Sequence, residues 1–276
     1  MKTSIALTPA PLSRVPFLYA GRLDTGLRRA AELGYDAVEL HLRDPAAEDM
    51  ASIAKSLRDL GLAVSSFGTG QGATVDRLTI SSPDPACRES ALRRLFSHVD
   101  AAAAFGACVI VGSMQGRLDA DRDVRDGQTA AAVEVLKRVA DRAAARGVRV
   151  AVEPLNRYET NFNNTVSDAL GVLERVGNPA LCLLLDTFHM NIEESSLPRA
   201  IAAAGRHIGL VHLADSNRGA AGTGHTDFAS VVEALRDAGF GGYLSAEILP
   251  MGDDDAAART SIETMRALLA SGRPKR

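Results

Sequence analysis

Four apolar stretches in the second half of the chain each carry, at or near the C-terminal end, a residue that can bind a metal or move a proton. They are Glu153, Asp186, His212 and Glu247, which lie 33, 26 and 35 residues apart, about one strand-and-helix unit each. A single acid at a strand end is commonly a helix N-cap. Three carboxylates gathered in apolar surroundings repel one another, however, and a bound cation relieves that repulsion. Oxygen donors with one nitrogen and no thiolate favour Mn²⁺, Mg²⁺ or Co²⁺, so we expect one divalent ion here.

The elements that would carry these residues alternate regularly along the chain. Short apolar runs are separated by longer stretches of helical periodicity, which predicts parallel strands covered by helices. The predicted strands are 4–8, 36–40, 62–67, 107–112, 148–155, 181–186, 208–213 and 243–249. The predicted helices are 24–33, 47–60, 85–105, 128–146, 166–176, 197–204, 228–238 and 255–270.

The number of these units predicts the fold. Eight strand-and-helix units in 276 residues favour a (β/α)₈ TIM barrel that forms one α/β domain over residues 1–276. An open nucleotide-binding sheet is disfavoured because no GxGxxG follows the first run. The long connections 68–84 and 112–126 follow strands, where a barrel keeps its active site. Seven predicted helices are followed by a residue suited to positive φ: Gly34, Gly61, Gly106, Gly147, Gly177, Gly205 and Gly239.

The composition disfavours several kinds of partner. With 31 Lys and Arg against 34 Asp and Glu, the net charge is −3, and we expect neither a nucleic-acid surface nor an anionic-membrane surface. No segment reaches 18 uninterrupted apolar residues, which predicts a cytoplasmic protein without a membrane span. Cys87, Cys108 and Cys182 lie far apart and are expected to be reduced, small core residues.

Longer strings around the four residues resemble the ketose 3-epimerases, the D-tagatose/D-psicose 3-epimerase group of the xylose isomerase-like TIM barrels. The strings are EPLNRYE at 153–159, LLLDTFHMNIEE at 183–194, HLADSNR at 212–218 with GHTDF at 224–228, and Glu247. The resemblance covers the whole chain and is densest from 148 to 250. It implies a metal-dependent sugar epimerase that forms a homo-oligomer, either a dimer or a tetramer.

The resemblance also implies a role for each matching residue. Glu153, Asp186, His212 and Glu247 match the family's metal ligands, with Mn²⁺ as the first candidate. Glu153 and Glu247 also match its acid/base pair. The residues that match those holding the substrate's oxygens are Glu159, His189 and Arg218.

The chemistry of the reaction agrees with this assignment. A C–H beside a ketone is a weak acid, so a metal must polarise the neighbouring oxygens before a carboxylate can remove the proton. Inverting the carbon through an enediolate then needs one acid/base group on each face, which Glu153 and Glu247 on non-adjacent strands can provide.

The substrate is less well defined by the sequence. We expect a small sugar, either a ketohexose such as D-tagatose, D-fructose or D-psicose, or a keto sugar acid such as 5-keto-gluconate. Met114 stands where family members often have Trp, and Ile248 is a small apolar neighbour of Glu247. Arg117 is either a clamp for a carboxylate or phosphate or a solvated loop residue.

Other histidines and acids near these motifs have structural interpretations. His41, His98 and His207 are assigned to structure or to the surface. Asp227 precedes a predicted helix and is expected to be its N-cap.

Three alternative functions are also compatible with the sequence. An aldose–ketose isomerase of the hydroxypyruvate isomerase or inosose type would use the same pair of glutamates. A DNA repair enzyme of the endonuclease IV type shares Asp-x-x-His at the sixth strand, but the third and fourth strands here lack its extra histidines. A non-catalytic barrel that binds a sugar or a partner protein would not need Glu247.

Overall fold

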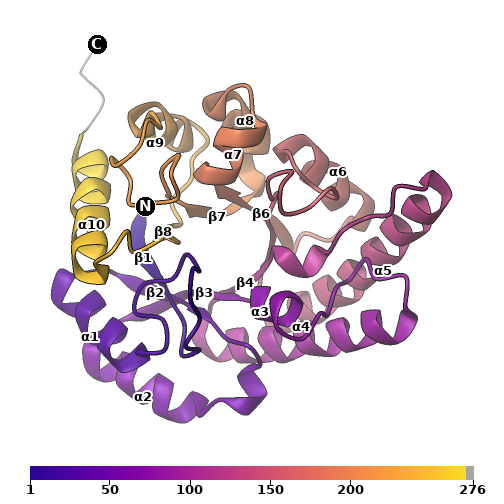
Figure 1. Cartoon of the computed structure of the whole chain (residues 1–276), viewed down its shortest axis with the longest axis horizontal. Coiled ribbons are helices and arrows are strands. Elements are labelled where there is room, and N and C mark those ends of the chain that lie inside the picture. The colour runs from indigo at the N-terminus through magenta and orange to yellow at the C-terminus, as the bar shows by residue number, and fades with distance from the viewer. Residues whose placement is uncertain (272–276) are drawn as a thin grey trace.

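Eight parallel strands close into a barrel in the computed structural model, which describes residues 1–271. The strands run in chain order around the barrel, and β1 pairs with β8 to close it (Figure 1). They are β1 (Lys2–Leu7), β2 (Ala37–His41), β3 (Ala63–Gly68), β4 (Cys108–Val111), β5 (Val150–Val152), β6 (Leu181–Asp186), β7 (Ile208–His212) and β8 (Tyr243–Ala246). The predicted (β/α)₈ barrel is therefore confirmed.

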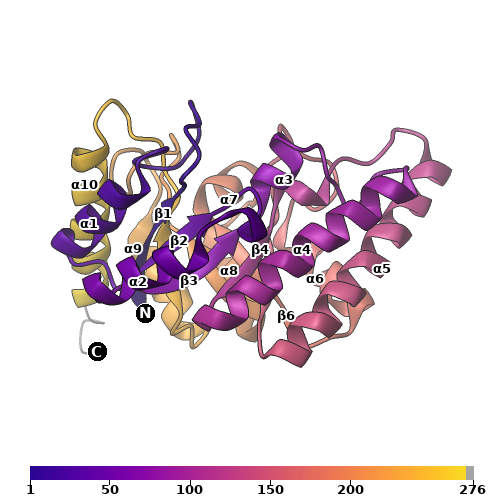
Figure 2. The same cartoon turned by 90° about the horizontal axis from the view of Figure 1, so that it is seen from below.

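Helices form a ring around the strands, with α1 and α10 side by side where the ring closes (Figures 1 and 2). The α-helices are α1 (Leu23–Leu33), α2 (Met50–Leu60), α3 (Gly70–Thr74), α4 (Pro85–Phe105), α5 (Arg122–Arg146), α6 (Val166–Val176), α7 (Thr187–Glu193), α8 (Leu197–Ala204), α9 (Phe228–Asp237) and α10 (Asp254–Ala270). Three short 3₁₀ helices are η1 (Pro45–Ala47), η2 (Ser113–Gln115) and η3 (Gly205–His207). No helix among residues 1–271 is long and apolar enough to cross a membrane.

Side-chain caps account for several helix boundaries. Helix α5 begins earlier than predicted because Asp121 accepts hydrogen bonds from the backbone N–H groups of Asp123 and Val124. Asp227 caps α9 through the N–H of Ser230, as predicted. At the opposite ends, all seven predicted glycines have positive φ, between 48° and 78°.

The strand ends differ from the prediction in ways that matter for the site. β5 spans only Val150–Val152, so Glu153 follows the strand directly. Helix α7 was not predicted, and it begins immediately after Asp186, whose carboxylate accepts the N–H of Phe188 at 2.8 Å. The same residue therefore ends a strand, caps a helix and points into the barrel mouth.

Part of the barrel interior is packed with small and aliphatic side chains from the neighbouring strands β4 to β7. Ile110, Ala151, Cys182, Leu184 and Leu210 form one buried cluster inside the barrel. All three cysteines are free, and only Cys182 is fully buried, while Cys87 and Cys108 are partly exposed. The larger core lies between the sheet and the surrounding helices, so the strands are held from both faces.

Candidate active site

The four predicted ligands meet at the carboxyl ends of β5 to β8. Asp186 and His212 are the last residues of β6 and β7, while Glu153 and Glu247 directly follow β5 and β8. One ligand-type atom from each lies within 4.8 Å of the others, and all four residues are buried. Parallel strands in a barrel all end at the same mouth, which is why residues separated by a whole strand-and-helix unit converge here.

The donor set fits a divalent cation. His212 Nδ1 lies 3.3 Å from Asp186 Oδ2, 3.3 Å from Glu247 Oε2 and 3.6 Å from Glu153 Oε1. Glu153 Oε1 is buried and has no hydrogen-bond partner among residues 1–271. A buried carboxylate oxygen without a donor is costly, and an ion shared with the neighbouring oxygens would satisfy it. Three oxygens and one imidazole nitrogen suit Mn²⁺, Mg²⁺ or Co²⁺.

The two glutamates of this cluster have opposite electrostatic surroundings. Burial, together with the nearby Glu247 and Asp186 carboxylates, raises the pKa of Glu153 well above its ordinary value, although His212 opposes the shift. Burial also works against ionised Glu247, but the facing His212 and Arg218 outweigh it and lower the pKa of that carboxyl. Carboxyls whose pKa values are displaced in opposite directions are typical of acid/base pairs.

Arg218 bridges two of the carboxylates. Its guanidinium contacts both Asp186 and Glu247, and it lies 4.8 Å from the centre of the Phe188 ring. The residue is only 8% exposed, so these contacts are made away from water. A planar guanidinium with several donors can hold both carboxylates at once, which a lysine ammonium cannot do in the same geometry.

The loop after β7 fixes Arg218 in an unusual backbone conformation. Arg218 has φ = 63°, in the left-handed region that non-glycine residues seldom occupy. Asp215 holds this loop because its carboxylate accepts N–H groups of Ser216 at 2.7 Å, Gly222 at 2.8 Å and Thr226 at 3.1 Å. These hydrogen bonds outweigh burial and lower the pKa of Asp215 to about 2. Strain of this kind is found where the surrounding structure determines a side chain's position.

His189 presents one ring nitrogen to the cluster. Its Nδ1 accepts hydrogen bonds from the backbone N–H of Asn156 at 3.4 Å and from the Asn156 amide at 2.7 Å. Burial lowers the pKa of His189 despite the nearby Asp186 carboxylate, so the ring is neutral and carries its proton on Nε2. Nε2 lies 3.8 Å from Asp186 and 3.9 Å from Glu153, which leaves it free to donate to a bound molecule.

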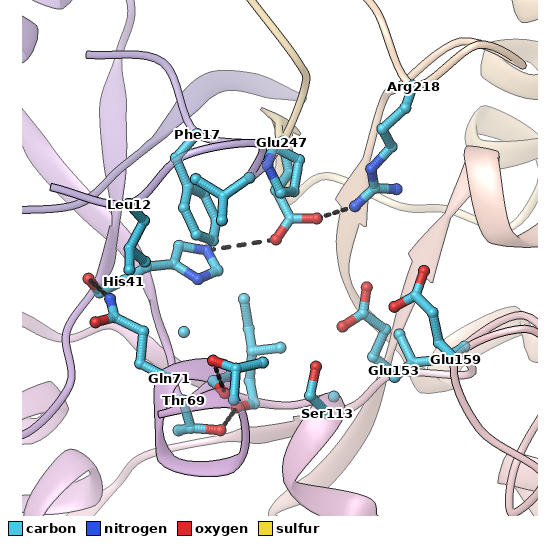
Figure 3. Close-up of a pocket in the computed structure, with 18 of the residues that line it drawn as sticks. Leu12, Phe17, His41, Thr69, Gln71, Ser113, Glu153, Glu159, Arg218 and Glu247 are labelled. Atoms are coloured by element: carbon cyan, nitrogen blue, oxygen red, sulfur yellow. Dashed lines mark hydrogen bonds and ion pairs between the residues drawn. The ribbon is translucent and has the colours of Figure 1, made fainter. Parts of the chain in front are cut away.

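A cavity of about 420 Å³ opens above the cluster. Figure 3 shows Glu153 and Glu159 on one side of the cavity, opposite His41, Leu12 and Phe17. Its volume lies within the range of small-molecule sites. The predicted residues Glu159, His189 and Arg218 all line it.

Three sequence candidates lie elsewhere. Arg117 does not line the cavity; its exposed side chain donates to the backbone carbonyls of Glu159 at 3.0 Å and Tyr158 at 3.4 Å. Met114 and Ile248 are fully buried and also do not line the cavity. The apolar wall therefore comes from other residues, including Phe17 and Phe188.

Comparison with known proteins places the chain in a family. Residues 27–268 match the family model described as xylose isomerase-like TIM barrel. The chain belongs to this family. L-ribulose 3-epimerase from Methylomonas sp. is 36% identical over 223 residues, which cover 79% of this chain and 75% of that protein. D-psicose 3-epimerase from Agrobacterium fabrum is 32% identical over 80% of this chain and 77% of its own length.

A solved structure of a relative agrees with these matches. D-allulose 3-epimerase from Methylomonas sp. in complex with D-allulose superimposes with a TM-score of 0.78 at 29% identity. The match covers 96% of this chain and 97% of that one. The relatives thus identify the chain as a xylose isomerase-like barrel of the ketose 3-epimerase group.

Two residues of this xylose isomerase-like barrel were missed by sequence reasoning. Glu39 is fully buried on β2, within hydrogen-bond distance of His212. His41, which was assigned to structure or the surface, lines the cavity, and its Nε2 lies 3.7 Å from Glu247 Oε1. The only signal was an acid two residues before a histidine in an otherwise apolar strand, AVELH.

Proposed function

We propose that the protein is a divalent-metal-dependent epimerase that inverts the carbon beside the ketone of a ketose. The observation that carries this proposal is the convergence of Glu153 and Glu247, from non-adjacent strands, on one buried cluster. The relatives named above act on L-ribulose and D-psicose, which favours a small neutral ketose as substrate.

Glu153, Asp186, His212 and Glu247 would hold the metal, with Mn²⁺ as the first candidate. When bound, the ion polarises the ketone and the adjacent hydroxyl, which makes the C–H between them acidic enough to lose its proton.

The proton transfers belong to the two glutamates. One carboxylate removes the proton from C3 on one face of the sugar, and the other carboxyl returns a proton to the opposite face of the enediolate. General acid/base groups placed in this way contribute about 10²–10⁴-fold each. Because the carboxyls come from β5 and β8, they can lie on opposite sides of one reacting carbon.

The three cavity residues orient the substrate around that carbon. His189 Nε2–H and the Arg218 guanidinium are donors for the carbonyl and hydroxyl oxygens. Glu159 accepts from the Asn156 amide at 2.9 Å and keeps its second carboxylate oxygen for a sugar hydroxyl. His189 and Arg218 are buried, which excludes water from these two donors and strengthens their contacts, whereas Glu159 is exposed at the rim.

A keto sugar acid would require a cation at the rim of the cavity. The exposed arginine that lines the cavity is Arg14, on the loop between β1 and α1, whereas Arg117 is engaged by backbone carbonyls. Activity on 5-keto-gluconate that is lost in Arg14→Gln would support the sugar-acid substrate.

We also propose that the protein forms a homo-oligomer. A homo-oligomer in solution, measured by light scattering, would support this assembly.

The central test follows the exchanged hydrogen. The purified protein is loaded with Mn²⁺ and incubated in D₂O with L-ribulose, D-fructose, D-tagatose or D-psicose. We expect the C3 epimer to form with deuterium at C3, detected by NMR. Deuterium confined to C1 would instead support an aldose–ketose isomerase, and no exchange with any ketose would contradict the proposal.

A further inference from the structure

A buried carboxylate lies on the far side of the imidazole that faces the metal cluster. Both oxygens of Glu39 are 3.1 Å from His212 Nε2, while His212 Nδ1 faces Asp186, Glu247 and Glu153. Glu39 has no solvent exposure and does not line the cavity, so it cannot touch a bound sugar.

The Glu39 carboxylate is fully satisfied by donors from three different strands. In addition to His212 on β7, it accepts from Ser66 Oγ on β3 at 2.7 Å and from His41 Nε2 on its own strand at 2.6 Å. An ionised group at the centre of a barrel is unfavourable unless it is paired in this way. An apolar residue would fill the same position at lower cost, so the fold alone does not account for a glutamate there.

The tautomer of His212 gives the carboxylate a role. A histidine binds a metal as neutral imidazole, with a lone pair on the ligating nitrogen and the proton on the other. If Nδ1 binds the ion, the proton must lie on Nε2, where Glu39 accepts it. Without this acceptor the ring could carry its proton on Nδ1 and present no lone pair to the ion.

The same carboxylate also orients the cavity wall. Glu39 holds His41, whose ring lies 4.2 Å from the ring of Phe17, on the side of the cavity opposite Glu153 (Figure 3). Gly68 makes room for the imidazole, because a Cβ there would lie 2.2 Å from His41 Nδ1. Glu39 therefore connects a metal ligand with a residue that lies beside Glu247.

We propose that Glu39 is a positioning residue that keeps the proton of His212 on Nε2, so that Nδ1 is available to the metal. The inference rests on the proposed metal site, and it names a residue that does not bind the metal but holds one of the metal ligands in place. Replacing a residue that hydrogen-bonds to a metal-binding histidine typically weakens metal binding by about 10–100-fold.

Glu39→Gln tests the proposal because it keeps the size of the side chain and removes its charge. Asp36→Asn is the matched control: it makes the same change just before β2, where Asp36 accepts from Thr3 and does not contact the cluster. Mn²⁺ affinity is measured on metal-free protein by electron paramagnetic resonance of free Mn²⁺. We expect Glu39→Gln to bind about 10–100-fold more weakly, and Asp36→Asn to match the unaltered protein.

A second measurement needs no substitution of Glu39. In the Mg²⁺-loaded, ¹⁵N-labelled unaltered protein, two-bond ¹H–¹⁵N correlations report the tautomer of each histidine, with His212→Gln used for assignment. We expect the His212 proton on Nε2. A proton on Nδ1, or equal Mn²⁺ affinity in Glu39→Gln and the unaltered protein, would overturn the inference.

The failure of this inference is distinguishable from failure of the proposed function. If the unaltered protein takes up no divalent ion, both the metal site and the role of Glu39 are wrong. If it binds Mn²⁺ more tightly than Glu39→Gln does but epimerises no ketose, only the proposed reaction is wrong.

Discussion

Glu153 and Glu247 reach the same buried cluster from β5 and β8, and their surroundings displace their pKa values in opposite directions. Within residues 1–271, Glu153 Oε1 has no hydrogen-bond partner, whereas Glu247 contacts Arg218 and lies beside His212. Two chemically identical side chains therefore hold protons differently because one is buried among carboxylates and the other faces cations.

Replacing either glutamate should abolish most of the activity. We expect Glu247→Gln and Glu153→Gln each to lower kcat by about 10²–10⁴-fold, because an amide cannot exchange a proton with C3. The measurement is steady-state epimerisation at saturating Mn²⁺, with bound metal quantified in each variant. Glu174→Gln changes an exposed acid on α6 and should retain normal activity. Normal turnover by Glu247→Gln would show that the reaction does not use this pair.

Gly112 should be intolerant of even one added carbon. A Cβ at this position would lie 2.3 Å from Glu153 Oε2, so Gly112→Ala must displace the carboxylate. A displacement of about 1 Å at a reacting group can lower the rate by about 100-fold. We therefore expect a large loss of kcat with a melting temperature close to that of the unaltered protein, measured by differential scanning fluorimetry.

The control for that variant is Gly171→Ala in helix α6. Apart from the neighbouring backbone of its own helix, no atom of residues 1–271 lies within 4 Å of the position that its Cβ would take. Alanine in a helix interior stabilises by about 0.4–1 kcal/mol relative to glycine. Equal activity of Gly112→Ala and Gly171→Ala would contradict the assigned position of Glu153.

Metal-free protein should lose stability as the pH rises above neutral. The pKa values of Glu153 and His212 are both raised in the folded protein. The stability that these two groups contribute is therefore full at a pH below their ordinary pKa values, and it is lost as the pH rises through their raised pKa values. For His212, burial opposes the shift, but Glu39, Glu247 and Asp186 outweigh it. A bound cation replaces those protons. The increase in melting temperature on adding Mg²⁺ should therefore grow as the pH rises above neutral.

The part of this dependence that comes from Glu153 can be separated from the part that comes from His212. Glu153→Gln has no proton to lose at this position, so its metal-free melting temperature should fall less steeply with pH. The same melting experiments in EDTA provide the comparison. A metal-dependent stabilisation that is constant with pH would argue against proton displacement from the cluster.

Arg218 should not be replaceable by lysine. Its guanidinium contacts Asp186 and Glu247 together, and a single ammonium cannot reproduce both contacts. We expect Arg218→Lys to lower kcat/KM by at least about 10-fold, since hydrogen bonds to charged groups contribute about 1.5–3 kcal/mol. Arg117→Lys should leave kcat/KM unchanged, because Arg117 lies outside the cavity. If Arg117→Lys alone strongly lowered kcat/KM, Arg117 would have to be assigned to the substrate site.

Some features of the fold could be predicted because their cause is local. Apolar runs of strand length, helices followed by glycine, and an N-cap such as Asp227 depend on residues that are close in sequence. Helix α7 was not predicted because seven residues are too few for a helical pattern of apolar residues to be recognised. Its N-cap, Asp186, was interpreted only as a metal ligand.

The sequence by itself determined the order of strands and helices, and with it the convergence of Glu153, Asp186, His212 and Glu247, because parallel strands of a barrel end at one mouth. Only the tertiary structure decided which side chains surround them. Glu39 meets His212, 173 residues away, across the barrel interior, and this contact depends on strand register. Arg218 enters the cavity while Arg117 does not, because loop hydrogen bonds direct each side chain. Non-local contacts of this kind leave no periodic pattern in the sequence.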